Sequence, residues 1–286
     1  MNKKGKMKNI YLKINKNHVA FVGLLIILFY GFITIMGIFW TPFDPLEMNF
    51  KEILQPPCFE TRHFMGTDQF GRDILSRIIY GSRISLGVSF SATFIAATFG
   101  VLMGIWAGFL GGIYDNCIMR INDILFSFPP LLLAIFIMGV LGENTYNVII
   151  AIGIVYIPQF ARISRAAILA IKNLEFVEAA SAIGGTRNRI LFKHLLPNII
   201  PSLIVQTSLC LSLGILLESS LSFLGLGVQP PFPSWGNILG DARRFIIIAP
   251  WSAIFPGITI FLIVIGFNLL GDGLRDILDP RLKNVS

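Results

Sequence analysis

The stretch EAASAIGGTRNRILFKHLLPN, residues 178–198, gathers carboxylate, guanidinium, amine and imidazole groups in a chain that is otherwise mostly apolar. Covalent chemistry would need a nucleophile beside a base, or a cluster of metal ligands, and this spacing supplies neither. The segment therefore predicts contact with another surface rather than catalysis. Two surfaces fit its physical features: the headgroups of a membrane, with the segment as a simple connector, or a cytoplasmic partner protein.

The residues of this stretch and those just before it also predict its secondary structure. Leu174 to Ile183 is a good helix-forming run, and Gly184 ends it because glycine readily takes the left-handed conformation found at helix ends. Thr186 can cap a second helix, Arg187 to Leu196, which Pro197 is expected to terminate or kink. The segment thus reads as a helix, a glycine corner and a second helix.

Elsewhere, the side chains that could do chemistry are scattered. The three cysteines and three histidines form no C-x-x-C and no ligand cluster, so neither a disulfide framework nor a metal site is expected. The sequence also lacks GxxxxGK[ST], the glycine-rich loop that cradles phosphates in P-loop ATPases. We therefore expect no catalytic residues, no bound metal and no cofactor in this chain.

Composition places the chain in a membrane. It is 54% hydrophobic and 14% charged, with a mean hydropathy of +0.73, whereas soluble domains carry about 25% charged residues. The net charge of +7 does not indicate nucleic acid, because six lysines precede the first apolar run, as in a cytoplasmic flank. The sequence predicts an all-α integral membrane protein.

Six segments are long and apolar enough to span a bilayer, which takes about 20 residues. They are Val19–Trp40, the interval between Arg83 and Asp115, Asp123 to Gly142, Tyr146 to about Arg165, Ile199–Phe223 and Trp251–Leu270. Between the first two, residues 66–86 predict a short amphipathic helix lying on the outer membrane interface. The third span is expected to carry Pro129 and Pro130 in its first turns.

Basic residues set the orientation. Sixteen of the 23 lysines and arginines fall on one side of the six spans, which predicts that both termini are cytoplasmic. The expected organisation is a basic cytoplasmic N-terminus (1–18), a first transmembrane helix (19–40), an extracytoplasmic loop with an amphipathic helix (41–83), a five-helix core (84–274) containing a cytoplasmic loop (173–197), and a cytoplasmic tail (275–286).

Two polar residues inside the spans are candidates for a translocation path. An ionisable side chain such as Glu218 is costly in a membrane and marks a functional site by default. The alternative is a structural carboxylate hydrogen-bonded to Ser219, Ser222 or a neighbouring helix. Asn268 could likewise face the path or pack against another helix.

The inner part of the chain resembles the EAA motif of binding-protein-dependent ABC import permeases. The matching residues are Glu178-Ala179-Ala180, then Gly184 after three residues, and then His194-Leu195-Leu196-Pro197 after nine more. Longer stretches, residues 63–86, 111–134, 218–236 and 267–281, are similar to the C-type permease of the dipeptide, oligopeptide and nickel group. Two departures are His194, where the broad motif prefers an aliphatic residue, and Phe64, where the group usually has proline.

The resemblance implies a type I ABC importer permease fold with six transmembrane helices in a bacterial inner membrane. It implies import of short peptides, nickel or metal chelates by alternating access. It also implies four kinds of partner: a second, B-type permease, two ATP-binding subunits that hold ATP and magnesium, an extracytoplasmic substrate-binding protein, and the lipid bilayer. The alternative function is a secondary transporter or channel subunit without an ATPase partner.

Specific residues acquire roles by the same resemblance. The loop 173–197 resembles the coupling helix that sits in a groove of the ATP-binding subunit, and its contact residues would be Glu178, Ala179, Ala180, Gly184, Leu196 and Pro197. Outside the membrane, Arg72 and Asp73 could contact the substrate-binding protein. They could equally form a pair within their own loop.

Overall fold

A computed structural model describes residues 17–278 of the chain, and within that range the regular secondary structure is helical apart from one isolated β-bridge between Thr67 and Asp73. The predicted basic N-terminus and cytoplasmic tail lie largely outside the described residues. The helices are α2 (His18–Phe39), α3 (Ile74–Leu110), α4 (Gly112–Phe126), α5 (Pro130–Leu141), α6 (Thr145–Ile171), α7 (Glu175–Ala182), α8 (Arg187–Arg189), the π-helix η1 (Ile190–Leu195), α9 (Leu196–Phe223), α10 (Trp235–Ala242) and α11 (Trp251–Leu278).

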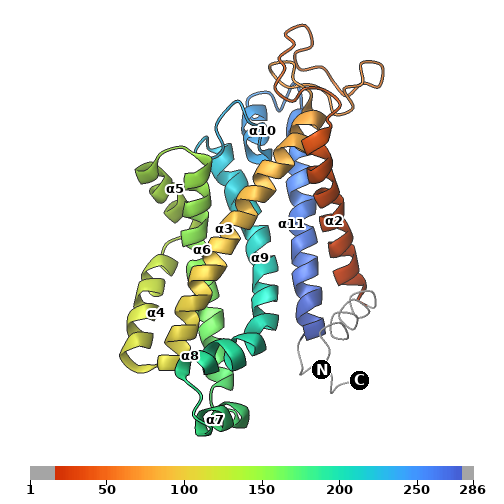
Figure 1. Cartoon of the computed structure of the whole chain (residues 1–286). Helices are drawn as coiled ribbons and strands as arrows, with labels where there is room; N and C mark the ends of the chain where they lie inside the picture. Colours follow the sequence, from red (N-terminus) through yellow and green to blue (C-terminus); the bar gives the residue numbers. More distant parts are fainter. Residues whose placement is uncertain (1–16, 279–286) are drawn as a thin grey trace.

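The helices form an elongated bundle with a loop region at each end (Figure 1). Residues 40–73, here called the outer loop, extend beyond one end of the bundle. Residues 173–197, here called the inner loop, extend beyond the other. The first described turn of α2 and the last of α11 lie at the inner-loop end (Figure 1), as an even number of membrane crossings requires.

Within residues 17–278, five helical segments are long and apolar enough to cross a membrane, and the pair α4 and α5 makes a sixth span if counted together. The third span is not one continuous helix, as the sequence suggested, because α4 and α5 meet at 91°. Pro129 has an extended backbone, which the following Pro130 favours. The two prolines therefore break the predicted span, with Pro129 preceding α5 and Pro130 beginning its first turn.

The amphipathic helix that the sequence placed on the membrane surface is the first part of the long helix α3. Asp73 caps it through a 2.7 Å hydrogen bond from the Ser76 amide, and the helix then continues unbroken to Leu110. Its apolar residues Ile74 and Ile78 are buried against α9, α10 and α11. The prediction of a separate interfacial helix was wrong because this apolar face packs on protein instead of lipid.

Small residues hold α3 against α6, the most extensive helix pair in the bundle. Ala92, Ala96, Gly100, Gly104 and Gly108 recur every fourth residue along α3. A Cβ atom added at Gly100 would lie 2.6 Å from the Phe160 Cβ, and one at Gly104 would lie 2.7 Å from the Ser164 Cβ. Close backbone approach of this kind drives helix association in lipid, where the hydrophobic effect is weak.

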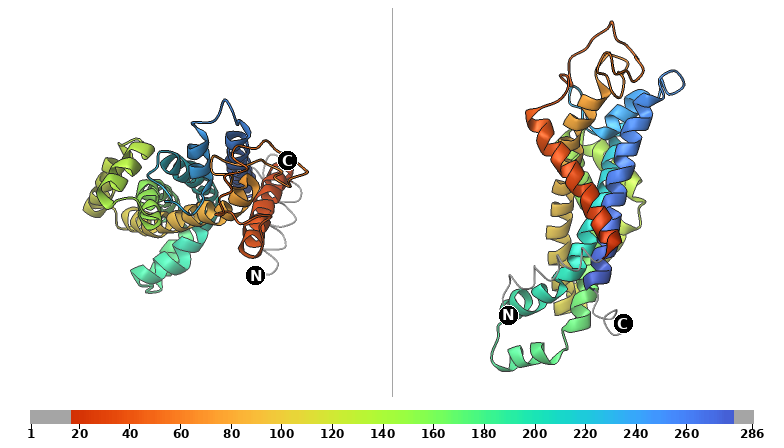
Figure 2. Two further views of the ribbon diagram at one scale, coloured as in Figure 1. Left: turned by 90° about the horizontal axis from the view of Figure 1, so that it is seen from above. Right: turned by 90° about the vertical axis from the view of Figure 1, so that its right-hand side faces the viewer.

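The remaining helices flank this pair. Seen from above, α2 and the α4–α5 pair lie on opposite sides of the bundle (Figure 2). Helix α2 is the least buried of the continuous spans, with only 17% of its most apolar stretch buried within the chain. It packs on α11, so most of its surface is available to lipid.

Candidate functional site

The inner loop has the corner that the sequence predicts. Helix α7 ends at Ala182, and Gly184 adopts a φ of +82°, which residues with a side chain rarely take. The Thr186 hydroxyl accepts a hydrogen bond from the Arg189 amide at 3.4 Å and so begins the second helix. Both the glycine corner and the threonine cap are confirmed.

The second helix does not end at Pro197. Instead α8 continues through the π-helix Ile190–Leu195 directly into α9, so one helical run extends from Arg187 to Phe223. Pro197 lies inside this run, directly after the π-helix, and the run bends between α8 and the membrane-spanning part of α9 (Figure 1), so the second helix is kinked rather than terminated here. The inner loop is therefore continuous with a membrane-spanning helix.

The inner loop carries its own apolar core. Val177 and Ala180 of α7 pack with Ile190, Leu191 and Leu195, and this cluster extends to α3 and α6. Ala180 is buried inside the loop and Ala179 is exposed. Of the two alanines predicted to make a close contact, only Ala179 faces outward.

The other predicted residues of this loop are mostly accessible. Glu178, Gly184 and Pro197 are exposed, and Leu196 is half-buried. Sequence reasoning missed Ile183, whose side chain is 88% exposed at the corner directly before Gly184. The sequence signal that could have identified Ile183 is its position directly before the glycine corner, where a side chain is expected to point outward. The loop thus presents a carboxylate, a small residue and an isoleucine on its outer surface.

Some charged side chains of the outer loop are instead buried and paired within the chain. Asp68 is buried and accepts hydrogen bonds from the Arg72 Nε at 2.6 Å and from the backbone amides of Phe70 and Arg72. The buried Arg77 lies 3.5 Å from the same carboxylate. Both arginines also approach Asp241 of α10, at 3.4 and 3.7 Å, so the network ties the loop to the bundle.

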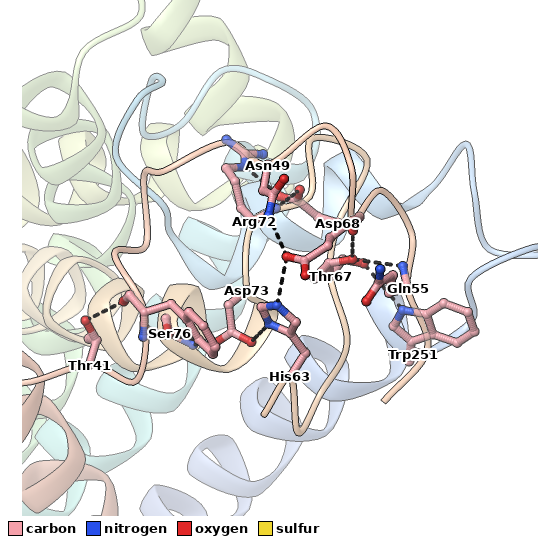
Figure 3. A network of polar contacts seen from close by, with 12 residues as sticks. Thr41, Asn49, Gln55, His63, Thr67, Asp68, Arg72, Asp73, Ser76 and Trp251 are labelled. Carbon is pink, nitrogen blue, oxygen red and sulfur yellow. Dashed lines mark hydrogen bonds and ion pairs between the residues drawn. The ribbon is translucent and has the colours of Figure 1, made fainter. Parts of the chain in front are cut away.

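His63 forms a second part of this network (Figure 3). Its Nδ1 lies 2.9 Å from Asp73 and its Nε2 lies 3.3 Å from Glu52. The Phe43 ring stacks on the imidazole at 4.4 Å between centroids. Asp73 also caps α3, so the histidine is fixed to the start of a spanning helix.

These contacts separate the two interpretations of Arg72 and Asp73. The side chains are 7% and 1% exposed, and each binds a partner inside the loop, Asp68 for the arginine and His63 for the aspartate. They form a self-contained network, although not with one another. Neither side chain offers a surface to a substrate-binding protein.

The two path candidates do not share a site. Glu218 is fully buried within the chain, and its carboxylate accepts hydrogen bonds from Ser222 at 2.8 Å and Ser219 at 3.4 Å. The Asn268 side-chain oxygen accepts a 2.7 Å hydrogen bond from Ser212. Ser212 and Glu218 are six positions apart on α9, which is about 9 Å along the helix axis. These contacts match the structural alternative for both residues.

A cavity of about 520 Å³ opens between α6, α9 and α11 near the inner end of the bundle. Its polar wall on α9 consists of Asn198, Ser202 and Gln206, and Arg275 of α11 also lines it. The Gln206 amide donates to the Gln159 side-chain oxygen of α6 at 3.1 Å. Among the described residues, no three His, Cys, Asp or Glu side chains are placed to hold a metal ion.

Comparisons with known proteins agree with this architecture. The profile for "Binding-protein-dependent transport system inner membrane component" matches residues 100–284, and that for "N-terminal TM domain of oligopeptide transport permease C" matches residues 7–57. The dipeptide transport system permease protein DppC of Alkalihalophilus pseudofirmus is 45% identical over 97% of this chain and 90% of its own length. The glutathione transport system permease protein GsiD of Pectobacterium atrosepticum is 41% identical over 97% and 92%.

A solved structure supports the fold independently. The inward-facing MetNI methionine ABC transporter has a chain that superimposes with a TM-score of 0.56 at 20% identity, covering 71% of this chain and 96% of that one. The shared architecture is the type I permease fold that the sequence predicts.

Proposed function

Because the chain belongs to the binding-protein-dependent transport system inner membrane components, we propose that it is the permease subunit of an ATP-driven importer of short peptides. The observation that carries this proposal is the similarity, over nearly the whole chain, to permeases named for dipeptides and for glutathione. Both of those cargoes are short peptides. Nickel and metal chelates, which the sequence resemblance also allows, gain no support from those names.

The proposed complex contains a second, B-type permease, two ATP-binding subunits and an extracytoplasmic substrate-binding protein. ATP and magnesium are held by the ATP-binding subunits, and this chain carries no cofactor of its own. It performs no covalent chemistry. Its task is alternating access, in which rigid-body movements open the path between the two permeases to one side and then the other.

The inner loop is the proposed coupling element between the ATPase subunits and the membrane. Glu178 and Ala179 face outward, where a partner can reach them, while Val177 and Ala180 anchor the loop to the bundle. The helical run from Arg187 to Phe223 connects the loop to the membrane without an intervening flexible segment. A displacement of the loop is therefore passed to α9.

Replacing Gly184 by valine tests this coupling. A Cβ at this position meets no atom within 4 Å, so the change acts only through the backbone, whose φ of +82° a β-branched residue disfavours. We expect the altered corner to reduce assembly with the ATP-binding subunits or substrate-stimulated ATPase activity by about tenfold, the effect of about 1.4 kcal/mol in binding.

Gly142→Val is the matched control, because Gly142 has a φ of +84°, also meets no atom within 4 Å and lies far from the inner loop. Normal assembly and normal stimulated ATPase activity in Gly184→Val would contradict the coupling role.

The cargo is tested by uptake into proteoliposomes containing the whole complex. We expect uptake of a labelled dipeptide that requires both ATP and the binding protein, and no comparable uptake of a nickel chelate. Dipeptide uptake without ATP would instead support a secondary transporter or a channel. A complex that imports only the metal chelate would refute the peptide assignment.

A further inference from the structure

The cavity between α6, α9 and α11 has a polar face that membrane burial does not explain. Asn198, Ser202 and Gln206 lie four residues apart on α9 and therefore share one face of that helix. Polar side chains on a spanning helix are costly against lipid and face the bundle interior or a water-filled space. This face of α9 therefore borders an aqueous or protein-filled space.

The groups lining the cavity suit a peptide terminus. The Arg275 guanidinium can bind a carboxylate through two parallel hydrogen bonds. The Gln206 amide nitrogen already donates to Gln159 and Cys210. The side-chain oxygens of Asn198 and Gln206 can accept hydrogen bonds from peptide N–H groups, and the Ser202 hydroxyl can donate to a peptide C=O group. Asp272 and Asp276, in the same turns of α11 as Arg275, are not among the lining residues. The volume of about 520 Å³ is in the range of small-molecule sites.

We propose that this cavity is a transient binding site for the C-terminal carboxylate of a peptide on its way to the cytoplasm, with Arg275 as the anion-binding group. The proposal rests on the proposed function of peptide import and extends it to a specific place in this chain. We therefore place the candidate translocation path at this cavity instead of at Glu218 and Asn268, the two residues that the sequence indicated. Neither of those two residues lines the cavity.

The cavity wall begins where the inner loop ends. Asn198 follows Pro197, and its side-chain amide donates to the His194 carbonyl of η1 at 2.6 Å. Pro201 and Ser202, also in the wall, lie one turn further along α9. A movement of the inner loop therefore changes the shape of the cavity directly, which would link carboxylate release to the state of the ATP-binding subunits.

Photolabelling tests the proposal in the complete membrane complex with its ATP-binding subunits, in nanodiscs of zwitterionic lipid and without the binding protein. The probe is a dipeptide carrying a diazirine on its first side chain and a free C-terminal carboxylate. We expect mass spectrometry to find the label within residues 198–209 in wild type. Amidation of the probe, or Arg275→Gln, should each reduce that label by about tenfold, since each removes one charge-assisted interaction.

Arg120→Gln is the matched control, because Arg120 is an exposed arginine of α4 that does not line the cavity. Ser202→Leu provides a second variant that fills the cavity without changing charge, and it should reduce the label as well. Assembly of each variant is checked by size-exclusion chromatography. Equal labelling of wild type and Arg275→Gln, or of the acid and amide probes, would overturn the proposal.

Two further outcomes distinguish related explanations. If Arg275 held a lipid phosphate instead, native mass spectrometry of Arg275→Gln in separate nanodiscs containing anionic lipid would show loss of bound anionic lipid, while peptide labelling stayed unchanged, which would also refute the site. If wild type with its binding protein imports dipeptide but shows no label at α9, only the cavity assignment fails. Absence of dipeptide uptake in wild type would refute the proposed function itself.

Discussion

The outer and inner loops are both rich in charge, but only the outer loop buries a group of its charged side chains. In the outer loop, Asp68, Arg72 and Asp73 are buried and find their partners within the same chain. In the inner loop, Glu178 and Arg187 are exposed, and no ion pair joins the charged side chains of this loop to other residues among 17–278. The comparison teaches that charges with internal partners shape the fold, whereas exposed ones are available to another molecule.

The largest expected effect comes from breaking the outer network. Asp68→Ala leaves the buried Arg72 and Arg77 without their central carboxylate, and removal of one partner from a buried ion pair typically costs about 3–5 kcal/mol of stability. We expect a lower Tm and a reduced yield of folded protein. Glu178→Ala in the inner loop should change stability by no more than about 0.5 kcal/mol. Equal losses in the two variants would erase the distinction between the loops.

An intermediate effect is expected at the inner corner. Ile183→Asp puts a charge where an apolar side chain is 88% exposed, so folding should be unaffected. Affinity for the ATP-binding subunits should fall by about thirtyfold, the effect of losing a contact worth about 2 kcal/mol. Affinity is measured by titrating the purified subunits.

The control for Ile183→Asp is Ile247→Asp, which changes an equally accessible isoleucine, 94% exposed, between α10 and α11. It should leave affinity for the ATP-binding subunits unchanged. If both substitutions weaken assembly alike, the loss reflects general destabilisation rather than docking at the inner corner.

The smallest effect is expected at Glu218, whose buried side chain is hydrogen-bonded to residues of the same chain, as the buried side chains of the outer loop are. Glu218→Gln keeps an oxygen that can accept the hydrogen bond from Ser222, so transport and Tm should stay close to wild type. Glu218→Leu should cost about 1–3 kcal/mol because the serine hydroxyls lose their acceptor. A folded Glu218→Gln variant that fails to transport would restore the path interpretation.

Features carried by local sequence were predictable. The long apolar runs identify five continuous helical spans, and Gly184 and Thr186 specify the corner of the inner loop through backbone preference and capping. The break between α4 and α5 also had a local signal in Pro129-Pro130, but proline inside a span is common enough in membrane helices that a kink and a 91° turn could not be separated.

Features that depend on distant contacts were not predictable. Residues 74–79 have an amphipathic pattern that suits a membrane surface as well as a protein core, and only packing on α9 to α11 decides between them. The Asp68–Arg72–Arg77–Asp241 network joins residues far apart in the sequence. The polar spacing of Asn198, Ser202 and Gln206 was visible, whereas their approach to Arg275 needed the fold.

The π-helix at Ile190–Leu195 affects how the inner loop is rotated about the helix axis. Its hydrogen bonds span one residue more than those of an α-helix, and one residue of α-helix corresponds to about 100° about the helix axis. The orientation of the inner loop around the helix axis therefore depends on which carbonyl oxygens accept the hydrogen bonds of the backbone amides in these six residues. A change of hydrogen-bond register here would turn the exposed face of the loop about the local helix axis without breaking the chain's helical continuity.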